Sequence, residues 1–234
     1  MDDGIKQEMM TYYNERAEEY DEIYTGGYGG KRRVTLEPGV YQKDVGKIAG
    51  MISDFGKGHL IDIACGTGFW LQYYAGNCYR ITLLDQSEKM LKECTRRVEK
   101  LGLVDLVTII QGDLFEVKLE TSTYDSALIG FLLSHLTLEQ EETFFLKLKR
   151  ILKPSSQLVF IDSAWNDERR KYRKKEGIQE RVLNDGRTFN VYKRYFNKTD
   201  IEVMFSNYNF EISDSHVGKA IVSAILRTKT AKGY

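Results

Sequence analysis

Short apolar runs and amphipathic segments alternate along the middle of the chain. From residue 58 onward, each apolar run is followed by a segment in which apolar residues recur at helical spacing. The runs predict strands at 60–64, 81–84, 106–110, 126–129 and 158–161. Helices are predicted at 69–75, after Ser87, and after the capping-box sequence 137–140. This alternation predicts an α/β fold: a doubly wound, mostly parallel sheet with helices on both faces.

The segments outside this alternation follow other patterns. Residues 5–24 predict one amphipathic helix, along one face of which lie Tyr13, Ala17, Tyr20 and Tyr24. Another helix is expected after Pro38. Strand-like sequence on both sides of Asn184-Asp185-Gly186 predicts a hairpin with a three-residue turn, at 178–195. A helix that begins at 199–202 and two closing strands at 210–213 and 221–226 complete the pattern.

The length of 234 residues is that of one ordinary domain. We expect one domain built from four consecutive parts. They are an N-terminal helical cap or lid at 1–57, a core at 58–164, an inserted helix and hairpin at 165–197, and a C-terminal helix with an antiparallel strand pair at 198–234.

Composition argues against several classes of partner. Lys and Arg together number 34, as do Asp and Glu, so the formal net charge is zero and no strong field for nucleic acid is expected. The three cysteines form no CxxC pair, and we expect no metal site. No apolar run approaches the roughly 20 residues that cross a bilayer, and the N-terminus is acidic and polar. We therefore expect a soluble cytoplasmic protein with a small-molecule partner and no membrane contact.

A glycine pair follows the first predicted strand, in Asp62-Ile63-Ala64-Cys65-Gly66-Thr67-Gly68. Gly66 and Gly68 have no Cβ, so the backbone of this loop can approach a ligand closely. Such a loop is typical of nucleoside-type cofactor sites in doubly wound proteins. No third glycine follows three residues later, which argues against a nicotinamide dinucleotide. A simple tight turn is the alternative interpretation.

Two acidic residues follow the next two strands. Asp85 lies seventeen residues after Gly68, at the end of the second predicted strand, where its carboxylate can accept from both ribose hydroxyls. Asp113 follows the third strand, where it can accept from an adenine amino group. Alternatively, Asp85 is an acid at the start of a helix, and Asp113 is an ordinary loop residue.

Together these residues resemble the cofactor site of class I S-adenosylmethionine-dependent methyltransferases. Residues 62–68 match the cofactor loop of the family, Asp85 its ribose-binding acid, and Asp113 with Leu114 its adenine contacts; Ala64 departs where many members have glycine. The resemblance implies S-adenosyl-L-methionine as cofactor, and a seven-stranded sheet whose last pair is antiparallel. The expected cofactor-binding residues are Tyr13, Arg16, Tyr20, Asp62, Ala64, Cys65, Gly66, Gly68, Asp85, Gln86, Asp113, Leu114 and Gly130.

His135 follows the fourth strand, on the side where an acceptor should enter. Methyl transfer is an in-line displacement that mainly needs alignment and exclusion of water. A general base is needed only if the acceptor is protonated at the working pH. His135 is therefore a candidate base or substrate contact, or else a core histidine bonded to the backbone.

The predicted hairpin places two cations among apolar residues. Arg181, Leu183, Phe189, Val191 and Lys193 should share one face, and cations in such surroundings call for an anion. Residues 181–193, 12–21 and Ser134-His135 also resemble a subgroup that includes a phosphonate O-methyltransferase. That resemblance implies that Arg181 and Lys193 hold an anionic acceptor. It also implies a tyrosine after the first helix, for which Tyr28 or Tyr24 is the candidate. The alternative is that both cations are solvated strand residues.

Other functions stay open at this point. The basic run 168–175 suggests RNA, but acids flank it, a solvated helix face explains it, and no Asn-Pro-Pro-Tyr motif follows the fourth strand. N- or S-methylation of a metabolite is an alternative to O-methylation. A nonenzymatic S-adenosylmethionine-binding regulatory protein is an alternative from another class. The N-terminal helix is expected to act as a lid, with glycines at 26–30 permitting motion, or simply to pack its tyrosines on the sheet.

Overall fold

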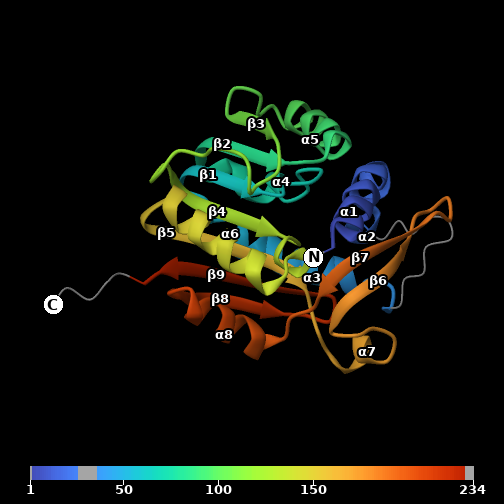
Figure 1. The fold of residues 1–234 in the computed structure, drawn as a ribbon. Helices are drawn as coiled ribbons and strands as arrows, with labels where there is room; N and C mark the ends of the chain where they lie inside the picture. Colours follow the sequence, from blue (N-terminus) through green and yellow to red (C-terminus); the bar gives the residue numbers. More distant parts are fainter. Residues whose placement is uncertain (1, 26–35, 230–234) are drawn as a thin grey trace.

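A seven-stranded sheet forms the centre of the molecule in the computed structural model, which describes residues 2–25 and 36–229 (Figure 1). The strand order is β3-β2-β1-β4-β5-β9-β8. Strands β1 to β5 pair in parallel, and β9 is antiparallel to both of its neighbours. The bounds are β1 Gly58–Ile63, β2 Cys78–Asp85, β3 Val107–Gln111, β4 Tyr124–Gly130, β5 Leu152–Ser163, β8 Phe210–Val217 and β9 Ile221–Thr228. The fold class predicted from the sequence is confirmed.

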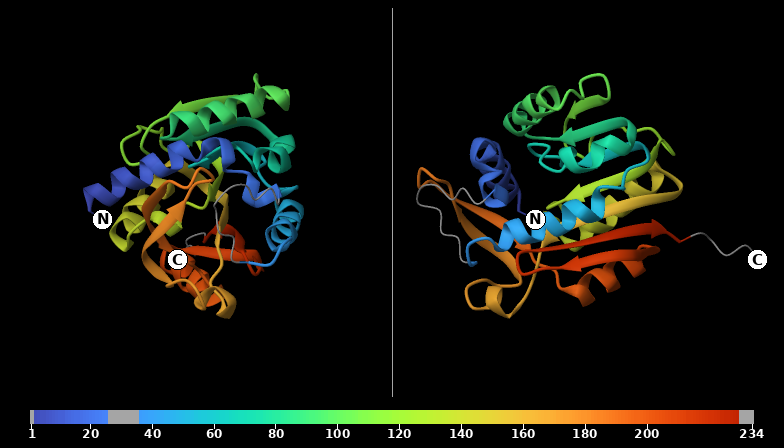
Figure 2. Two further views of the ribbon diagram at one scale, coloured as in Figure 1. Left: turned by 90° about the vertical axis from the view of Figure 1, so that its right-hand side faces the viewer. Right: turned by 180° about the vertical axis from the view of Figure 1, so that it is seen from behind.

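Helices cover both faces of this sheet, as the two views in Figure 2 show. One face packs against α3 (Val40–Ile52), α4 (Leu71–Tyr74) and α5 (Glu88–Lys100), and the other against α6 (Leu138–Ile151) and α8 (Lys198–Asn207). Side chains of β5 alternate between these layers: Phe160 belongs to the core beneath α6 and α8, and Val159 to the core beneath α3. The strands are buried on both faces, which explains their nearly continuous apolar sequence.

The N-terminal segment differs from the single helix predicted over residues 5–24. Helix α1 (Asp3–Glu15) ends at Arg16, a 3-10 turn follows at Ala17–Glu19, and α2 spans Glu22–Thr25. The break allows Asp21 to accept a hydrogen bond from the Thr67 hydroxyl at 2.6 Å and to pair with Arg97. These tertiary contacts stabilise the broken segment more than a continuous helix would. Tyr28 and the glycines of residues 26–30 lie outside the described residues.

A separate two-stranded sheet, formed by β6 (Glu176–Val182) and β7 (Thr188–Arg194), packs against α1 (Figure 1). Its register pairs Arg181 with Phe189 and Gly177 with Lys193, so the expected face is formed. The amide of Leu183 donates to the Arg187 carbonyl, which leaves a three-residue turn whose Gly186 has a φ of 94°. The predicted hairpin and its turn are therefore confirmed.

Three helical segments differ from their predicted extents. The basic segment forms only one short helix, α7 (Asp167–Arg170), capped by Asn166. Helix α8 is capped by Asn197 in a capping box with Asp200, two residues earlier than expected. The helix expected at 69–75 is reduced to α4 and a 3-10 turn at Ala75–Asn77. Among the described residues, no helix is both long and apolar enough to cross a membrane.

Candidate active site

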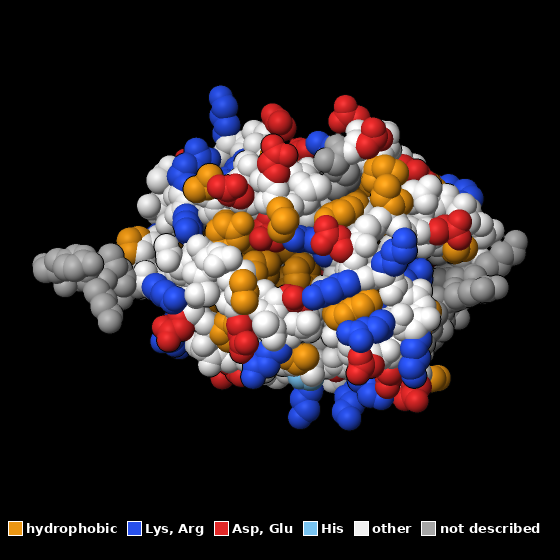
Figure 3. Space-filling model, turned by 60° about the horizontal axis from the view of Figure 1, so that its bottom comes forward, with side chains coloured by type: hydrophobic (Ala, Val, Ile, Leu, Met, Phe, Trp, Pro, Cys, Tyr) orange, Lys and Arg blue, Asp and Glu red, His pale blue; other side chains and the backbone are white. Residues whose placement is uncertain are grey.

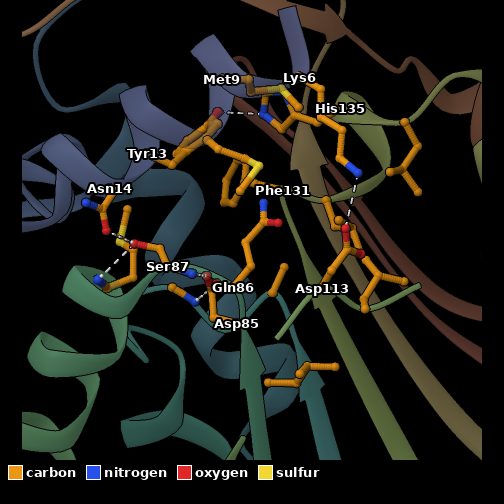
Figure 4. Close-up of a pocket in the computed structure, with 18 of the residues that line it drawn as sticks. Lys6, Met9, Tyr13, Asn14, Asp85, Gln86, Ser87, Asp113, Phe131 and His135 are labelled. Carbon is orange, nitrogen blue, oxygen red and sulfur yellow. Dashed lines mark hydrogen bonds and ion pairs between the residues drawn. The ribbon is translucent and has the colours of Figure 1, made fainter. Parts of the chain in front are cut away.

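A cavity of about 370 Å³ lies between α1 and the carboxyl ends of the central strands. Its walls come from α1, the loop after β1, the ends of β2 and β3, and the loop after β4, as Figure 4 shows. This is the edge at which open parallel sheets bind ligands. The expected cofactor residues that line it are Tyr13, Tyr20, Ala64, Gly66, Asp85, Gln86, Asp113, Leu114 and Gly130.

The loop after β1 has a left-handed backbone at three positions. Ala64, Gly66 and Gly68 have φ angles of 58°, 55° and 69°. A Cβ at Gly68 would lie 2.8 Å from Sγ of Cys94, so this position needs glycine for packing against α5. Ala64 is strained, because an L residue with a side chain disfavours this region. The strain explains physically why glycine suits position 64.

Asp85 holds the loop to the second strand. Its carboxylate accepts hydrogen bonds from the amides of Gly66 and Ser87, each at 2.9 Å. Burial raises the pKa of Asp85, and these backbone hydrogen bonds partly oppose that shift. The side chain of the next residue, Gln86, points into the cavity (Figure 4). Asp85 thus both supports the start of α5 and presents an acid to the cavity.

Helix α1 spans the cavity and is attached on both sides. Near its start, Lys6 Nζ lies 3.3 Å from Oδ2 of Asp113. Near its end, Asn14 Oδ1 accepts from the Ser87 hydroxyl at 3.0 Å, and Glu15 pairs with Lys89 at 2.6 Å. These contacts place α1 over the ends of β2 and β3, as expected of a cap.

Four expected cofactor residues do not line this cavity. Asp62 is 2 % exposed and accepts a hydrogen bond from the Tyr74 hydroxyl at 2.8 Å, and burial raises its pKa to about 7. Cys65 is buried, and Gly68 packs against α5. Arg16 lines a neighbouring cavity instead. Their contact with a cofactor therefore stays a prediction.

That neighbouring cavity has a volume of about 580 Å³ and shares Tyr13, Tyr20 and Phe131 with the first. It extends from the shared wall along β6 and β7 toward α7. Its charged lining consists of Arg16, Arg169, Arg173, Glu180, Arg181 and Lys193. Positive charge therefore dominates the space next to the first cavity.

His135 lies at the boundary between the two cavities. Its Nδ1 is 2.7 Å from the carbonyl oxygen of Tyr192, which can only accept, so Nδ1 carries the proton. Its Nε2 then accepts from the Tyr13 hydroxyl at 2.6 Å. Burial and the nearby charge of Lys193 lower the pKa of His135 well below its usual value. The imidazole is neutral, and both of its nitrogens are engaged.

Lys193 is buried and has partners within the protein. Its Nζ donates to Ser134 Oγ at 2.5 Å and lies 3.4 Å from Oδ1 of Asp162. Burial lowers the pKa of Lys193, and the charge of Asp162 opposes that shift. The expectation that a bound anion must compensate this cation is therefore corrected in part, because Asp162 supplies a counter-charge.

Arg181 has no such counter-charge. Its Nη2 donates to the hydroxyl of Tyr195 at 3.0 Å, and no Asp or Glu among the described residues forms an ion pair with it. Tyr24 is buried against the rings of Phe69, Trp70 and Phe131 and also lines the second cavity. Tyr28, the other candidate tyrosine, lies outside the described residues.

Comparison with known proteins agrees with this geometry. Residues 61–160 match a family model described as a methyltransferase domain. An uncharacterized methyltransferase of Geobacillus sp. (strain WCH70) is 26 % identical over 215 residues, which cover 88 % of this chain and 92 % of that protein. The demethylmenaquinone methyltransferase of Lactiplantibacillus plantarum is 28 % identical over 113 residues, so the chain spans only 47 % of that relative.

Among solved structures, the DhpI–SAM–HEP complex is similar in fold. Its TM-score is 0.75 at 24 % identity, and the match covers 97 % of this chain and 99 % of that one. The chain contains a methyltransferase domain at residues 61–160 and has the fold of solved S-adenosylmethionine-dependent methyltransferases.

The first cavity has the features that the cofactor of such a methyltransferase requires. A Cβ placed on Gly66 would have no heavy atom nearer than 3.9 Å, so the loop leaves open space on the cavity side. Asp85 and Asp113 present carboxylates to this cavity, and Met9, Met90 and Leu114 provide apolar wall. These residues would hold S-adenosylmethionine.

Several lining residues of this methyltransferase were not predicted from the sequence. Lys6, Met9 and Met10 precede Tyr13 at helical spacing, a signal that could have placed them on one face of α1. Arg169 and Arg173 were assigned to a solvated basic run, which is wrong for these two residues: Arg169 is 6 % exposed and Arg173 is half-buried. The partnership of Lys193 with Asp162 had no signal in the local sequence.

Proposed function

We propose that the protein transfers a methyl group from S-adenosylmethionine to an anionic oxygen of a small acceptor, of the phosphonate or carboxylate class. The observation that carries this proposal is the cationic cavity that shares a wall with the cofactor cavity. S-adenosylmethionine, when bound, supplies a methyl group that is activated by a sulfonium leaving group.

The charged side chains support an anionic acceptor. Arg181 donates from its guanidinium to the Tyr195 hydroxyl and has no carboxylate partner within the described part of the chain, so an anion would improve its electrostatic environment. Lys193, on the same face of the hairpin, is held close to this point by Ser134 and Asp162. A partly buried cation that meets an anion avoids the penalty of an unpaired charge.

The shared wall supports alignment of acceptor and donor. Tyr13, Tyr20 and Phe131 belong to both cavities, so an acceptor held by Arg181 and Lys193 lies beside the cofactor space. Phe131 has a φ of 55°, a strained conformation of the kind that concentrates at functional sites. Phosphonate and carboxylate oxygens are ionised at neutral pH, so the protein needs to orient them and exclude water rather than remove a proton.

The second candidate function is methylation of an acceptor that carries a proton. The position of His135 beside the cofactor cavity favours it. The low pKa of this residue keeps the imidazole neutral, and Nε2 accepts from the Tyr13 hydroxyl at 2.6 Å and lies 3.5 Å from Nζ of Lys193. A rearranged Tyr13 would leave Nε2 as a base for a phenol or an amine.

A turnover screen tests the proposal. S-adenosylhomocysteine release is measured with matched sets of alkylphosphonates, carboxylates, phenols, amines and thiols. We expect turnover with the phosphonates or carboxylates and little with the others. Turnover with amines or thiols alone would contradict the anionic acceptor. Tight binding of S-adenosylmethionine without turnover of any acceptor would instead favour the regulatory alternative.

Acidic and basic side chains are interspersed over the face shown in Figure 3, and hydrophobic side chains gather in a hollow at its centre. Among the residues coloured there, this face has no continuous basic patch. Nucleic acid binding usually needs such a patch to contact the phosphate backbone. On this face, the distribution of charge therefore favours a small molecule over RNA as the acceptor.

A further inference from the structure

The second cavity contains more positive charge than a single anionic group requires. Arg16, Arg169, Arg173 and Arg181 line it, and within the described ranges none of the four forms an ion pair with an Asp or Glu. Every Asp and Glu of the chain belongs to those ranges, so no acidic side chain elsewhere can supply the missing partner. Glu180 also lines the cavity but pairs with none of these arginines.

The cations form two groups that adjoin along the cavity. In the group next to the cofactor cavity, the charges of Lys193, Arg181 and Arg16 all act on His135. In the second, distal group, Arg169 and Arg173 follow β5, and the amide of Arg173 donates to the Arg169 carbonyl at 3.0 Å. Burial and the charge of Arg181 lower the pKa of Arg173, so the two groups are close to each other. Figure 1 shows α7, which contains Arg169, below the hairpin, whereas α1 lies near its top.

Tyr195 separates the two groups. The Arg169 guanidinium lies over its ring, 4.6 Å from the centroid, and Arg181 donates to its hydroxyl at 3.0 Å. Burial raises the pKa of Tyr195, but the charges of Arg181, Arg169 and Lys193 outweigh that effect and lower it. The ring therefore lies in the field of three cations.

The distal group also has an unsatisfied polar atom. Arg169 is 6 % exposed; its Nη2 donates to the Ala220 carbonyl at 3.1 Å, and its buried Nε has no hydrogen-bond partner among the residues that the structure describes. Buried donors that lack acceptors are costly, which indicates that this end of the cavity is shaped for an acceptor group from outside the chain.

We propose that the methyl acceptor is a small diacid, whose second anionic group binds Arg169 and Arg173 while Arg181 and Lys193 hold the group that is methylated. The inference rests on the proposed function and deepens it by naming the class of acceptor. A volume of about 580 Å³ lies within the range of about 300–1,000 Å³ of small-molecule sites, so the cavity has room for both ends. No bond forms or breaks at the second group, which only positions the acceptor.

Binding measurements test the diacid directly. Isothermal titration of the full chain, saturated with S-adenosylhomocysteine, compares propylphosphonate with 3-phosphonopropionate, and butylphosphonate with 4-phosphonobutyrate. Within each pair only the diacid carries a second anionic end. We expect the diacid of at least one pair to bind about tenfold more tightly or better, as a charge-assisted contact in a partly buried site would provide.

Two variants assign that gain to the distal arginines. Arg173→Ala removes a half-buried cation of the cavity, and it should abolish most of the advantage of the diacid while weakening the binding of the monofunctional phosphonate much less. Arg170→Ala is the matched control, because Arg170 is exposed, pairs with Asp167 and does not line the cavity. Retained binding of the monofunctional phosphonate also shows that Arg173→Ala is folded.

The outcomes separate this inference from the proposed function. Three results would overturn the diacid inference. The first is equal affinity for both members of each pair, and the second is a gain in affinity that survives Arg173→Ala. The third is no binding of either compound at millimolar concentration. If the diacid binds more tightly in an Arg173-dependent way but neither compound yields S-adenosylhomocysteine, the second anion site stands and phosphonate methylation fails. If propylphosphonate is methylated and the diacid has no advantage in affinity, phosphonate methylation stands and the second anion site fails.

Discussion

The hydroxyl of Tyr13 lies 2.6 Å from Nε2 of His135, and this hydrogen bond closes the wall between the two cavities. Because Nδ1 of His135 donates to the Tyr192 carbonyl, the imidazole is fixed from both sides. The pKa of Tyr13 is raised well above its usual value by burial, so its phenol stays protonated and remains the donor. His135 therefore orients the Tyr13 hydroxyl and is not positioned to take a proton from an acceptor.

His135 should be less important for catalysis than Arg181. An ionised acceptor needs no base, so we expect His135→Ala to retain activity within about tenfold, whereas Arg181→Ala should lose about 10- to 100-fold in kcat/KM for an anionic acceptor. Initial rates of S-adenosylhomocysteine release measure both. Arg227→Ala, an exposed arginine on β9, is the control. Complete loss of activity in a folded His135→Ala protein would show that His135 acts as a base.

The ion pair between Lys6 and Asp113 should slow release of the cofactor. Lys6 lies on α1, and its removal takes away one of the attachments that hold this helix over the cavity. Because the pair is partly exposed, we expect a modest effect: a several-fold faster dissociation of S-adenosylhomocysteine from Lys6→Ala, with unfolding free energy changed by less than about 1 kcal/mol. Stopped-flow fluorescence measures the dissociation rate. Lys100→Ala, at the far end of α5, should leave it unchanged.

Asp62 should make stability depend on pH. Burial raises its pKa to about 7 in the folded protein, against 3.8 for the free side chain. Between these values the folded state holds a proton that the unfolded state has released, so the free energy of unfolding falls as pH rises from about 4 to about 7 and then levels off. The total effect is at most about 4 kcal/mol.

Asp62→Asn tests this dependence, because a neutral amide cannot titrate and its oxygen can still accept from Tyr74. Urea unfolding at pH 5 and pH 8 should show a smaller loss of stability in Asp62→Asn than in the wild type. The exposed Asp54→Asn variant should behave as the wild type. Parallel pH profiles of Asp62→Asn and wild type would contradict the buried, protonated carboxyl.

Ala64 should be a site where glycine stabilises the protein. Its φ of 58° disfavours a residue with a Cβ, by about 1–2 kcal/mol, whereas glycine loses about 0.5–1 kcal/mol more entropy on folding. We therefore expect Ala64→Gly to raise the free energy of unfolding by up to about 1 kcal/mol. Ala75→Gly is the matched control: its φ of −61° suits alanine, so the same change should destabilise. Equal destabilisation of the two variants would argue against strain at Ala64.

The core of the fold was predictable because its signals are local. Each strand of the parallel sheet is a short apolar run, and Gly66 and Gly68 mark the turn after the first of them. The capping box at Thr137 and the turn at Gly186 likewise lie within a few residues of the structure that they specify. Such features require no knowledge of what lies beside them in space.

The remaining features depend on contacts between distant segments. Helix α1 ends at Arg16 although the sequence pattern continues, because Asp21 is held by Thr67 and Arg97. The inward direction of Arg169 could not be predicted, since a basic run does not indicate which of its members turns toward the interior. The counter-charge of Lys193 comes from β5, which meets the end of β7 only through the tertiary fold.

Helix α1 contributes Lys6 and Tyr13 to the cofactor cavity, and Tyr13 also bounds the acceptor cavity. A displacement of this single helix would therefore open both compartments at once. Donor loading and product departure would then share one rate constant, and where that opening limits turnover, kcat would not depend on the nucleophilicity of the acceptor. The two products would leave during the same opening event, so their release would show a single dissociation rate rather than two independent rates.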